Sequence, residues 1–422
     1  MRRAILLGVA AALWVTVEPA GAGEWPQYRG PERRGTSGES GFLASWGEGQ
    51  PAEAWRRPIG AGYSGVAMAG GRLFTMAVAG DEEVVLCLDP ESGEELWRTA
   101  VGPAREEELG DGGPRSTPSV AGGMVYAASA SARLVALAAA DGSLVWQREL
   151  APAGAAPRFG YSVSPLVDGG QVVVEAGGSA EEPGVLAFDA ATGELRWSAL
   201  AGPAGYSSPL AVEIAGRRQY VLFRRAGAEV VALSPDGELL WRHPTAALAI
   251  VTMPVFVPPD RLFVASADDV FGGLMLRIRE SEGAFRVEEV WSERLMRNHF
   301  NTSVAVDGYL YGFDNGTLRC LDAATGERRW SRRGLGKGSL VAAGGLLFLL
   351  GDDGSLVLAP ATPEGFYEAG RVQAMSGRAW TSPSLAGGRL YLRDFDEIVA
   401  YDLRPREAGA ATGVQPAAGA EP

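Results

Sequence analysis

Apolar and polar residues alternate in short runs along most of the chain, and one phrase of this kind recurs. Clear copies end in tryptophan and run over 87–97, 136–146, 187–197 and 320–330, a shorter copy covers 232–241, and a degenerate one ends at residue 291. The alternation predicts two β-strands in each copy. Between them, Asp and Gly predict a tight turn, because Asp accepts hydrogen bonds from nearby amides and Gly tolerates positive φ. The tryptophans recur at roughly 40 to 50 residues, the length of a four-stranded propeller blade.

A second recurring piece precedes each phrase. It consists of Ser or Thr near a proline, an apolar pair, two glycines and another alternating run, as in 117–129, 164–176 and 382–394. This pattern predicts two inner strands joined by a tight turn. The inner strands are expected to start near Tyr63, Ser116, Val163, Ser207, Thr252, Thr302, Ser339 and Thr381. The sequence therefore predicts an all-β fold, an eight-bladed β-propeller of four-stranded blades over residues 51–404.

The last blade lacks its outer strand, because the repeat stops at Leu403. A matching strand stands near the other end, where 53–57 resembles 95–99. We expect this N-terminal strand to complete the eighth blade, which leaves no open sheet edge in the ring. Each repeat tryptophan is expected to dock against the small first residue of a neighbouring phrase, burying apolar area. The docking set is Trp55, Trp97, Trp146, Trp197, Trp241, Trp291 and Trp330.

The two ends of the chain differ from the repeats. Arg2 and Arg3, an apolar run over 4–17 and small residues at 20–22 predict a signal peptide over 1–22 and a periplasmic or secreted mature protein. No cysteine stands at the cleavage site, so no lipid anchor is expected, and no second stretch is long and apolar enough to be a membrane span. Residues 23–50 form an N-terminal extension. The Ala-, Gly- and Pro-rich tail at 405–422 is expected to be disordered.

The charge of the chain limits the classes of partner that can be expected. The chain carries 38 basic and 51 acidic residues, a net charge of −13, and has no long basic run. Nucleic acid is therefore not expected as a partner, since its recognition requires a phosphate-neutralising surface. Only two histidines occur, His243 and His299, so a zinc site with several histidines is excluded, and no metal site is expected.

The phrases resemble the PQQ-like β-propeller repeat superfamily, with its Ala-x-Asp-x-x-x-Gly-x-x-x-Trp motif, over about residues 50–404. The resemblance implies one of two branches: dehydrogenases that use pyrroloquinoline quinone (PQQ) with calcium, or non-enzymatic propellers such as the outer-membrane assembly factor BamB. The chain lacks the adjacent cysteines of many such dehydrogenases, because Cys87 and Cys320 stand in different blades, and we expect both to be buried without a disulfide. It also lacks the lipoprotein cysteine of BamB. The segment 24–31 resembles the mature start of many secreted bacterial propellers.

The connections that lead into the inner strands are expected to meet on one face, at the mouth of the central channel. They carry aromatic and hydrogen-bonding side chains, a mixture that predicts a binding pocket for a small molecule or peptide. Trp380 is expected either to stack on a planar ligand or to plug the channel. The candidate ligand-binding residues are Tyr63, Arg115, Tyr161, Tyr206, Asn298, His299, Asn301, Lys337, Arg378 and Trp380.

Three functions follow from these observations. The favoured one is an exported scaffold that binds a protein, peptide or small ligand without catalysis or cofactor. The alternatives are a PQQ-dependent dehydrogenase of an alcohol or sugar, with calcium, and a BamB-like factor in outer-membrane protein assembly.

Overall fold

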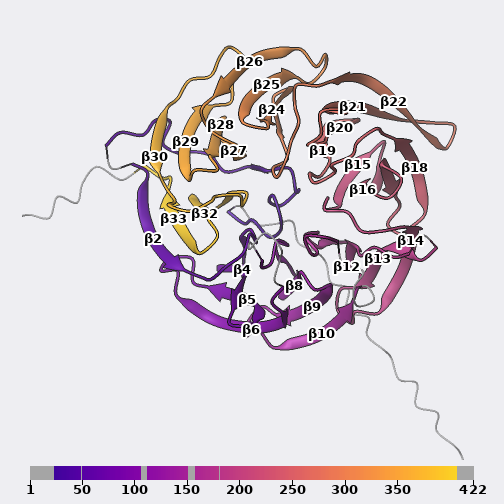
Figure 1. Ribbon diagram of the computed structural model, residues 1–422, viewed down its shortest axis with the longest axis horizontal. Helices are drawn as coiled ribbons and strands as arrows, with labels where there is room; N and C mark the ends of the chain where they lie inside the picture. The colour runs from indigo at the N-terminus through magenta and orange to yellow at the C-terminus, as the bar shows by residue number, and fades with distance from the viewer. Residues whose placement is uncertain (1–22, 49, 106–111, 151–156, 180, 406–422) are drawn as a thin grey trace, which may run out of the picture.

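A computed structural model describes residues 23–48, 50–105, 112–150, 157–179 and 181–405, so the expected signal peptide and nearly all of the expected disordered tail lie outside the described residues. The strands form eight sheets arranged as blades around a central axis (Figure 1). The eight-bladed all-β prediction is confirmed. Over the described residues, no helix is long and apolar enough to cross a membrane.

In each of the first four blades, four antiparallel strands follow one another from the channel outward. Blade 1 contains β3 (Ala67–Ala69), β4 (Arg72–Ala79), β5 (Glu82–Leu88) and β6 (Glu95–Pro103). Blade 2 contains β7 (Ser119–Ala121), β8 (Met124–Ala128), β9 (Arg133–Ala138) and β10 (Leu144–Glu149). Blade 3 contains β11 (Leu166–Asp168), β12 (Gln171–Glu175), β13 (Pro183–Asp189) and β14 (Leu195–Ala201). Blade 4 contains β15 (Leu210–Ile214), β16 (Arg217–Arg224), β17 (Glu229–Leu233) and β18 (Leu239–Pro244).

The other four blades follow the same plan, with an added strand in blade 7. Blade 5 contains β19 (Val255–Val257), β20 (Arg261–Ala265), β21 (Gly273–Ser281) and β22 (Ala284–Glu293). Blade 6 contains β23 (Val304–Val306), β24 (Tyr309–Asp314), β25 (Thr317–Asp322) and β26 (Arg328–Arg333). Blade 7 contains β1 (Thr36–Ser37), β27 (Ser339–Ala343), β28 (Leu346–Leu350), β29 (Ser355–Pro360) and β30 (Gly370–Gln373). Blade 8 contains β31 (Ser384–Ala386), β32 (Arg389–Arg393), β33 (Glu397–Asp402) and β2 (Ala52–Pro58).

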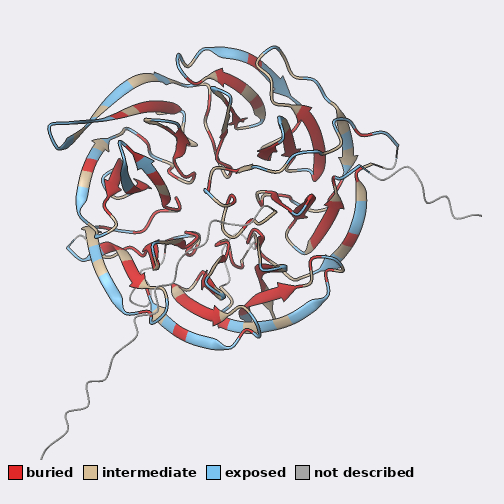
Figure 2. Cartoon of the chain, turned by 180° about the vertical axis from the view of Figure 1, so that it is seen from behind, coloured by how far each residue is buried: buried red, intermediate tan, exposed pale blue. Residues whose placement is uncertain are grey.

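The N-terminal strand closes the ring as predicted. Strand β2 pairs antiparallel with β33, and Trp55 lies opposite Ala400. The same register recurs inside blade 3, where Trp197 lies opposite Ala187. The alternating apolar residues of the middle strands form the core, whereas the outermost strands carry most of the exposed surface (Figure 2). Both cysteines are buried and free.

Five of the seven repeat tryptophans contact the next blade through its turn glycine. A Cβ added at Gly142 of blade 2 would lie 2.5 Å from the indole of Trp97 in blade 1, and the Trp97 Nε1 donates to the Ala139 carbonyl at 3.2 Å. The small first residue of each phrase instead faces the tryptophan of its own blade, as Cys87 faces Trp97. The expected partner of the indole was therefore wrong in detail. Glycine is required at the turn both for its positive φ and because the ring leaves no room for a side chain. Further pairs of this kind are Trp55–Gly93, Trp146–Gly193, Trp197–Gly237 and Trp291–Gly326.

Two glycines of blade 2 allow the two requirements, a positive φ and space for the indole, to be tested separately. Gly142 and Gly123 have nearly the same φ, 74° and 76°, but only Gly142 lies under an indole, whereas nothing stands within 4 Å of a Cβ at Gly123. Gly123→Ala is expected to cost about 1–2 kcal/mol of backbone strain. Gly142→Ala is expected to cost about 1–3 kcal/mol more, because the methyl group overpacks against Trp97. Thermal melting of the two variants checks this, and equal melting temperatures would refute the packing role of the glycine.

Residues 24–39, the N-terminal segment, cross the middle of the ring (Figure 1). Trp25 forms an isolated bridge with Met68 of β3, and Ser37 of β1 pairs in parallel with Ala343 of β27. Arg29 and Arg33 are buried and donate to backbone carbonyls of blades 6 and 3, respectively. The extension is therefore an integral part of the propeller that divides the central channel.

Candidate functional site

A cavity of about 480 Å³ opens at the end of the channel where the connections enter the inner strands. Each of the eight connections contributes at least one lining residue, and Tyr28 of the N-terminal segment adds another. Ring closure and the repeat thus bring side chains from distant parts of the sequence together. The lining residues are Tyr28, Tyr63, Gly65, Arg115, Thr117, Phe159, Ser162, Ser164, Tyr206, Ser208, Val251, Met253, His299, Phe300, Asn301, Lys337, Trp380, Thr381 and Ser382.

Hydroxyl groups connect neighbouring blades at the base of these connections. The Thr117 hydroxyl accepts from the Gly65 amide, the Ser164 hydroxyl from the Thr117 amide, and the Ser208 hydroxyl from the Ser164 amide, each at 3.0 Å. These residues are the Ser and Thr that precede the inner strands. No strand pairs with the neighbouring blade at this point, so the side chains supply the hydrogen bonds between blades. They thereby fix the positions of the connections around the cavity.

Four rings form a continuous aromatic wall. Trp380 stacks on Phe300 at a centroid separation of 4.3 Å and on Tyr63 at 5.7 Å, and His299 lies against Phe300 at 4.0 Å. The Arg378 guanidinium lies 4.5 Å from the centroid of the Trp380 ring. Because protein groups already contact the faces of the indole, a planar ligand would meet Trp380 at its edge rather than stack on it.

The charged lining groups are basic. Arg115 lies over the Tyr63 ring at 5.4 Å and donates to the Phe159 carbonyl at 3.1 Å, whereas Lys337 lies over the Phe300 ring at 5.7 Å. Among the described residues, no Asp or Glu lines the cavity. Burial, aided by the nearby Lys337 ammonium, lowers the pKa of His299, so this imidazole is neutral at pH 7. Its buried Nδ1 has no hydrogen-bond partner within the described chain.

Seven of the ten candidate residues line the cavity: Tyr63, Arg115, Tyr206, His299, Asn301, Lys337 and Trp380. The structure does not bring the other three to it. Tyr161 and Asn298 are 1% exposed and face the protein interior, where the Asn298 amide donates to the Phe313 carbonyl at 3.0 Å. Arg378 is exposed and lies outside the lining.

Several aromatic and apolar lining residues were not predicted from the sequence. Phe159 and Phe300 stand one or two positions from predicted residues of the same connections, so only the side-chain directions were unknown. Tyr28 could not be placed, because nothing in the sequence indicates that the N-terminal segment enters the channel. The missed residues are Tyr28, Gly65, Phe159, Val251, Met253 and Phe300, together with the hydroxyl-bearing Thr117, Ser162, Ser164, Ser208, Thr381 and Ser382.

The lining does not fit a calcium-bound quinone. Calcium binds six to eight oxygen ligands, usually with several carboxylates. Asn301 is the one amide side chain of the lining, and no described carboxylate accompanies it. Over the described residues, no group of three or more His, Cys, Asp or Glu side chains is placed to hold a metal ion. The described lining therefore does not supply the ligands that this cofactor would need.

Comparisons with known proteins agree with this fold. The family model described as outer membrane protein assembly factor BamB matches residues 39–148 and 81–332. BamB from Moraxella catarrhalis has a similar structure, with a TM-score of 0.59, 16% identity, and coverage of 84% of this chain and 99% of that one. The quinohemoprotein alcohol dehydrogenase from Comamonas testosteroni has a TM-score of 0.62 at 14% identity, over 96% and 84%. At such identities these two likenesses show the fold alone.

No curated protein matches the chain in sequence. The two matches of the family model, by contrast, together cover residues 39–332, more than half of the chain. The chain belongs to the PQQ-like β-propeller family that this model describes as the outer membrane protein assembly factor BamB.

Proposed function

We propose that the protein is an exported, non-catalytic binding propeller whose channel-mouth cavity holds an anionic ligand with a planar or aromatic part. One observation carries the proposal. The cavity presents Arg115 and Lys337 with no described carboxylate, in a chain whose net charge is −13. Basic side chains inside a partly closed, aromatic-lined cavity attract an anion and orient it. Export rests on the sequence of residues 1–22.

The wall chemistry supports the same class of ligand. The half-buried Arg115 and Lys337 lie over the faces of Tyr63 and Phe300, at 5.4 and 5.7 Å from the ring centroids, so each cation contacts an aromatic ring of the wall. Tyr206 and Phe159, 6.2 Å apart, supply further aromatic surface. A ligand carboxylate attracted by these cations would leave its apolar part against the rings.

A second candidate function is a role in outer-membrane protein assembly, which the description of the matching family favours. This function requires a protein partner and no ligand in the cavity. The two candidates therefore differ in whether the cavity binds an anion.

Calorimetric titration of the mature protein with 2-naphthoate, and with the neutral 2-naphthalenemethanol as matched control, tests the proposal. We expect saturable binding of the naphthoate and at least about tenfold weaker binding of the alcohol, since a charged hydrogen bond contributes about 1.5–3 kcal/mol. Failure of the carboxylate to bind, or equal affinities for both compounds, would refute the anion site.

The neutral His299 predicts how this affinity depends on pH. Its folded pKa lies below the ordinary value of about 6.5, so acidification through that pKa adds a positive charge beside Lys337. The affinity for 2-naphthoate is expected to rise as the pH falls below about 6.5, as long as the carboxylate of the ligand stays mostly ionised. Titrations of the wild type and of His299→Gln at several pH values check this. The rise should be lost in the variant, and an unchanged rise would exclude His299 as its source.

A further inference from the structure

The lining of the channel-mouth cavity is arranged in layers. From blade 1 to blade 4, the hydrogen bonds between a backbone amide and the hydroxyl of the next blade join equivalent positions of the connections. The Met253 amide donates to the Thr302 hydroxyl in the same way, at 3.1 Å. Ser339 and Ser382 stand at this position in blades 7 and 8, four residues before the end of β27 and β31. The residues two positions earlier in the eight connections all line the cavity, and we call them the mouth ring.

The mouth ring carries its cations on one side only. From blade 6 round to blade 2, it combines both cations with the stacked rings of the wall, as Phe300, Lys337, Trp380, Tyr63 and Arg115. From blade 3 to blade 5 it contains no cation and consists of Ser162, Tyr206 and Val251. The carboxylate of a bound anion is therefore attracted to the side of blades 6 to 2.

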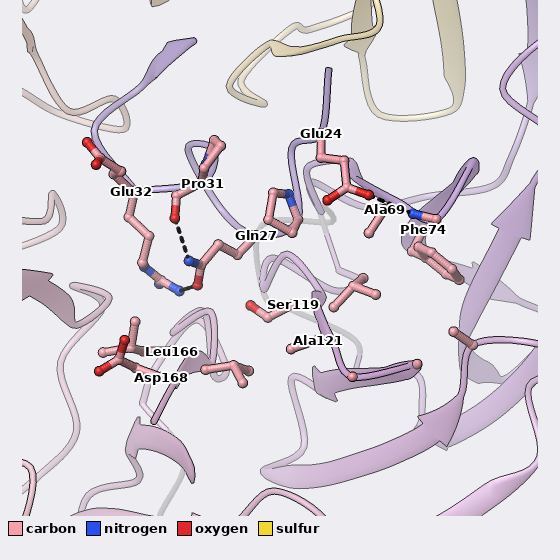
Figure 3. A pocket seen from close by; sticks show the side chains of 18 of the residues that line it. Glu24, Gln27, Pro31, Glu32, Ala69, Phe74, Ser119, Ala121, Leu166 and Asp168 are labelled. Carbon is pink, nitrogen blue, oxygen red and sulfur yellow. Dashed lines mark hydrogen bonds between the residues drawn. The ribbon is translucent and has the colours of Figure 1, made fainter. Parts of the chain in front are cut away.

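The N-terminal segment forms the floor of this cavity. On the other side of the segment lies a second cavity of about 1000 Å³, which is lined by Glu24, Gln27 and Glu32 of the segment (Figure 3). Their neighbour Tyr28 lines the channel-mouth cavity instead. The segment thus separates the two cavities, and a ligand that enters through the mouth meets Tyr28 at the bottom.

Tyr28 lies on the side of the cavity away from the cations. Its ring packs against the hydrophobic cluster of blades 4 and 5, which includes Met253 and Phe256. In a ring of eight blades, these two blades stand opposite blades 8 and 1.

The hydroxyl of Tyr28 is available to a ligand. Within the described part of the chain it forms no hydrogen bond, and it is not enclosed by protein as the partnerless hydroxyl of Tyr161 is. Burial raises the pKa of Tyr28, although the nearby Arg29 and Arg33 act in the opposite direction. The hydroxyl therefore stays protonated at neutral pH and can both donate and accept a hydrogen bond.

We propose that the ligand is an aromatic carboxylate with a hydroxyl group at the end remote from the carboxylate, and that the hydroxyl of Tyr28 recognises this group. The inference rests on the proposed anion site and names the class of its ligand. A planar ligand whose carboxylate lies at the cationic side extends its other end towards blades 4 and 5 and the floor. An apolar end would displace water from the Tyr28 hydroxyl without replacing its hydrogen bond, which weakens binding. A site built in this way favours the hydroxylated acid over the unsubstituted one.

Calorimetric titration of the mature protein with 6-hydroxy-2-naphthoate and with 2-naphthoate tests the inference. The two acids share the carboxylate and the ring system and differ only in the hydroxyl at the opposite end. We expect the wild type to bind the hydroxylated acid about three- to tenfold more tightly, as one net hydrogen bond implies. This comparison needs no variant. In Tyr28→Phe, which keeps the ring that packs against blades 4 and 5, the preference should disappear, whereas the affinity for 2-naphthoate should stay near that of the wild type.

Tyr161→Phe and Tyr206→Phe are the matched controls, because each removes the same group. Tyr161 lies outside the lining, and Tyr206 belongs to it but its oxygen already accepts from the Phe159 amide at 3.4 Å. Both variants should keep the preference for the hydroxylated acid. Equal affinities of the wild type for the two acids, a preference that persists in Tyr28→Phe, or its loss in Tyr206→Phe alone would overturn the role of Tyr28 and leave the anion site in place. No binding of either acid by the wild type would overturn the proposed function together with this inference.

Discussion

A chain that lacks residues 23–60 is expected to have no cooperative thermal transition near that of the full mature protein. The deletion removes β2, which supplies the outer strand of blade 8, and with it the buried Trp25, Trp46 and Trp55. Truncation of one buried tryptophan costs about 3–5 kcal/mol. The loss of three is comparable to the whole stability of an ordinary domain, about 5–15 kcal/mol.

A variant of the deleted chain in which β2 is moved behind β33 provides the control for this deletion. In it, residues 50–60 follow residue 404 through a turn copied from 89–94, so that β2 reaches β33 as the other outer strands reach theirs. Circular dichroism melting should show partial recovery of the transition in this variant, because Trp55 returns opposite Ala400 whereas Trp25 and Trp46 remain absent. A deleted chain that melts like the full protein would show that the N-terminal strand does not close the ring.

Replacing Arg115 and Lys337 together by glutamine is expected to weaken 2-naphthoate binding by about 100-fold or more. Each residue supplies a charge to the cavity, and a hydrogen bond to a charged group contributes about 1.5–3 kcal/mol. Each single variant should lose about tenfold or more. Calorimetry measures the three affinities, and thermal melting should show that the fold is kept.

Arg158→Gln is the matched control for these variants. Arg158 also stacks on an aromatic lining residue, Phe159, at 5.2 Å, and lies on the same connection as Ser162, but it is exposed and does not line the cavity. The control carries the same change in net charge as each single variant and should bind 2-naphthoate nearly as the wild type does. An equal loss in Arg158→Gln would mean that the overall charge of this face, rather than the cavity, determines binding.

The architecture could be predicted from the sequence because it repeats. Seven of the eight blades carry a repeat tryptophan, and the turn and the alternation recur, so an ambiguous copy can be interpreted from the others. The missing outer strand of blade 8 indicates where 53–57 must pair. The mouth of the channel was predicted for the same reason: connections at equal positions in a ring must meet. The seven candidate residues that line the cavity were predicted from this argument alone.

The residues of the site that were not predicted depend on side-chain directions and on the N-terminal segment, which does not repeat. Tyr161 and Phe159 differ by two positions, yet one is buried in the protein and the other lines the cavity. Alternation cannot decide this in an irregular connection. The path of the N-terminal segment was equally inaccessible, because Trp25 and Arg33 find their partners in blades 1 and 3 through single contacts that leave no periodic pattern.

The central claim, that the channel-mouth cavity binds a planar anion, is tested most directly by diffraction from crystals of the mature protein soaked with 6-bromo-2-naphthoate. The anomalous signal of bromine locates the ligand without assumptions about its pose. We predict one strong peak within the cavity lined by Tyr63, Phe300 and Tyr206, with the carboxylate density beside Arg115 or Lys337. A peak elsewhere on the propeller, or an empty cavity in crystals of a protein that binds the compound in solution, would contradict the account.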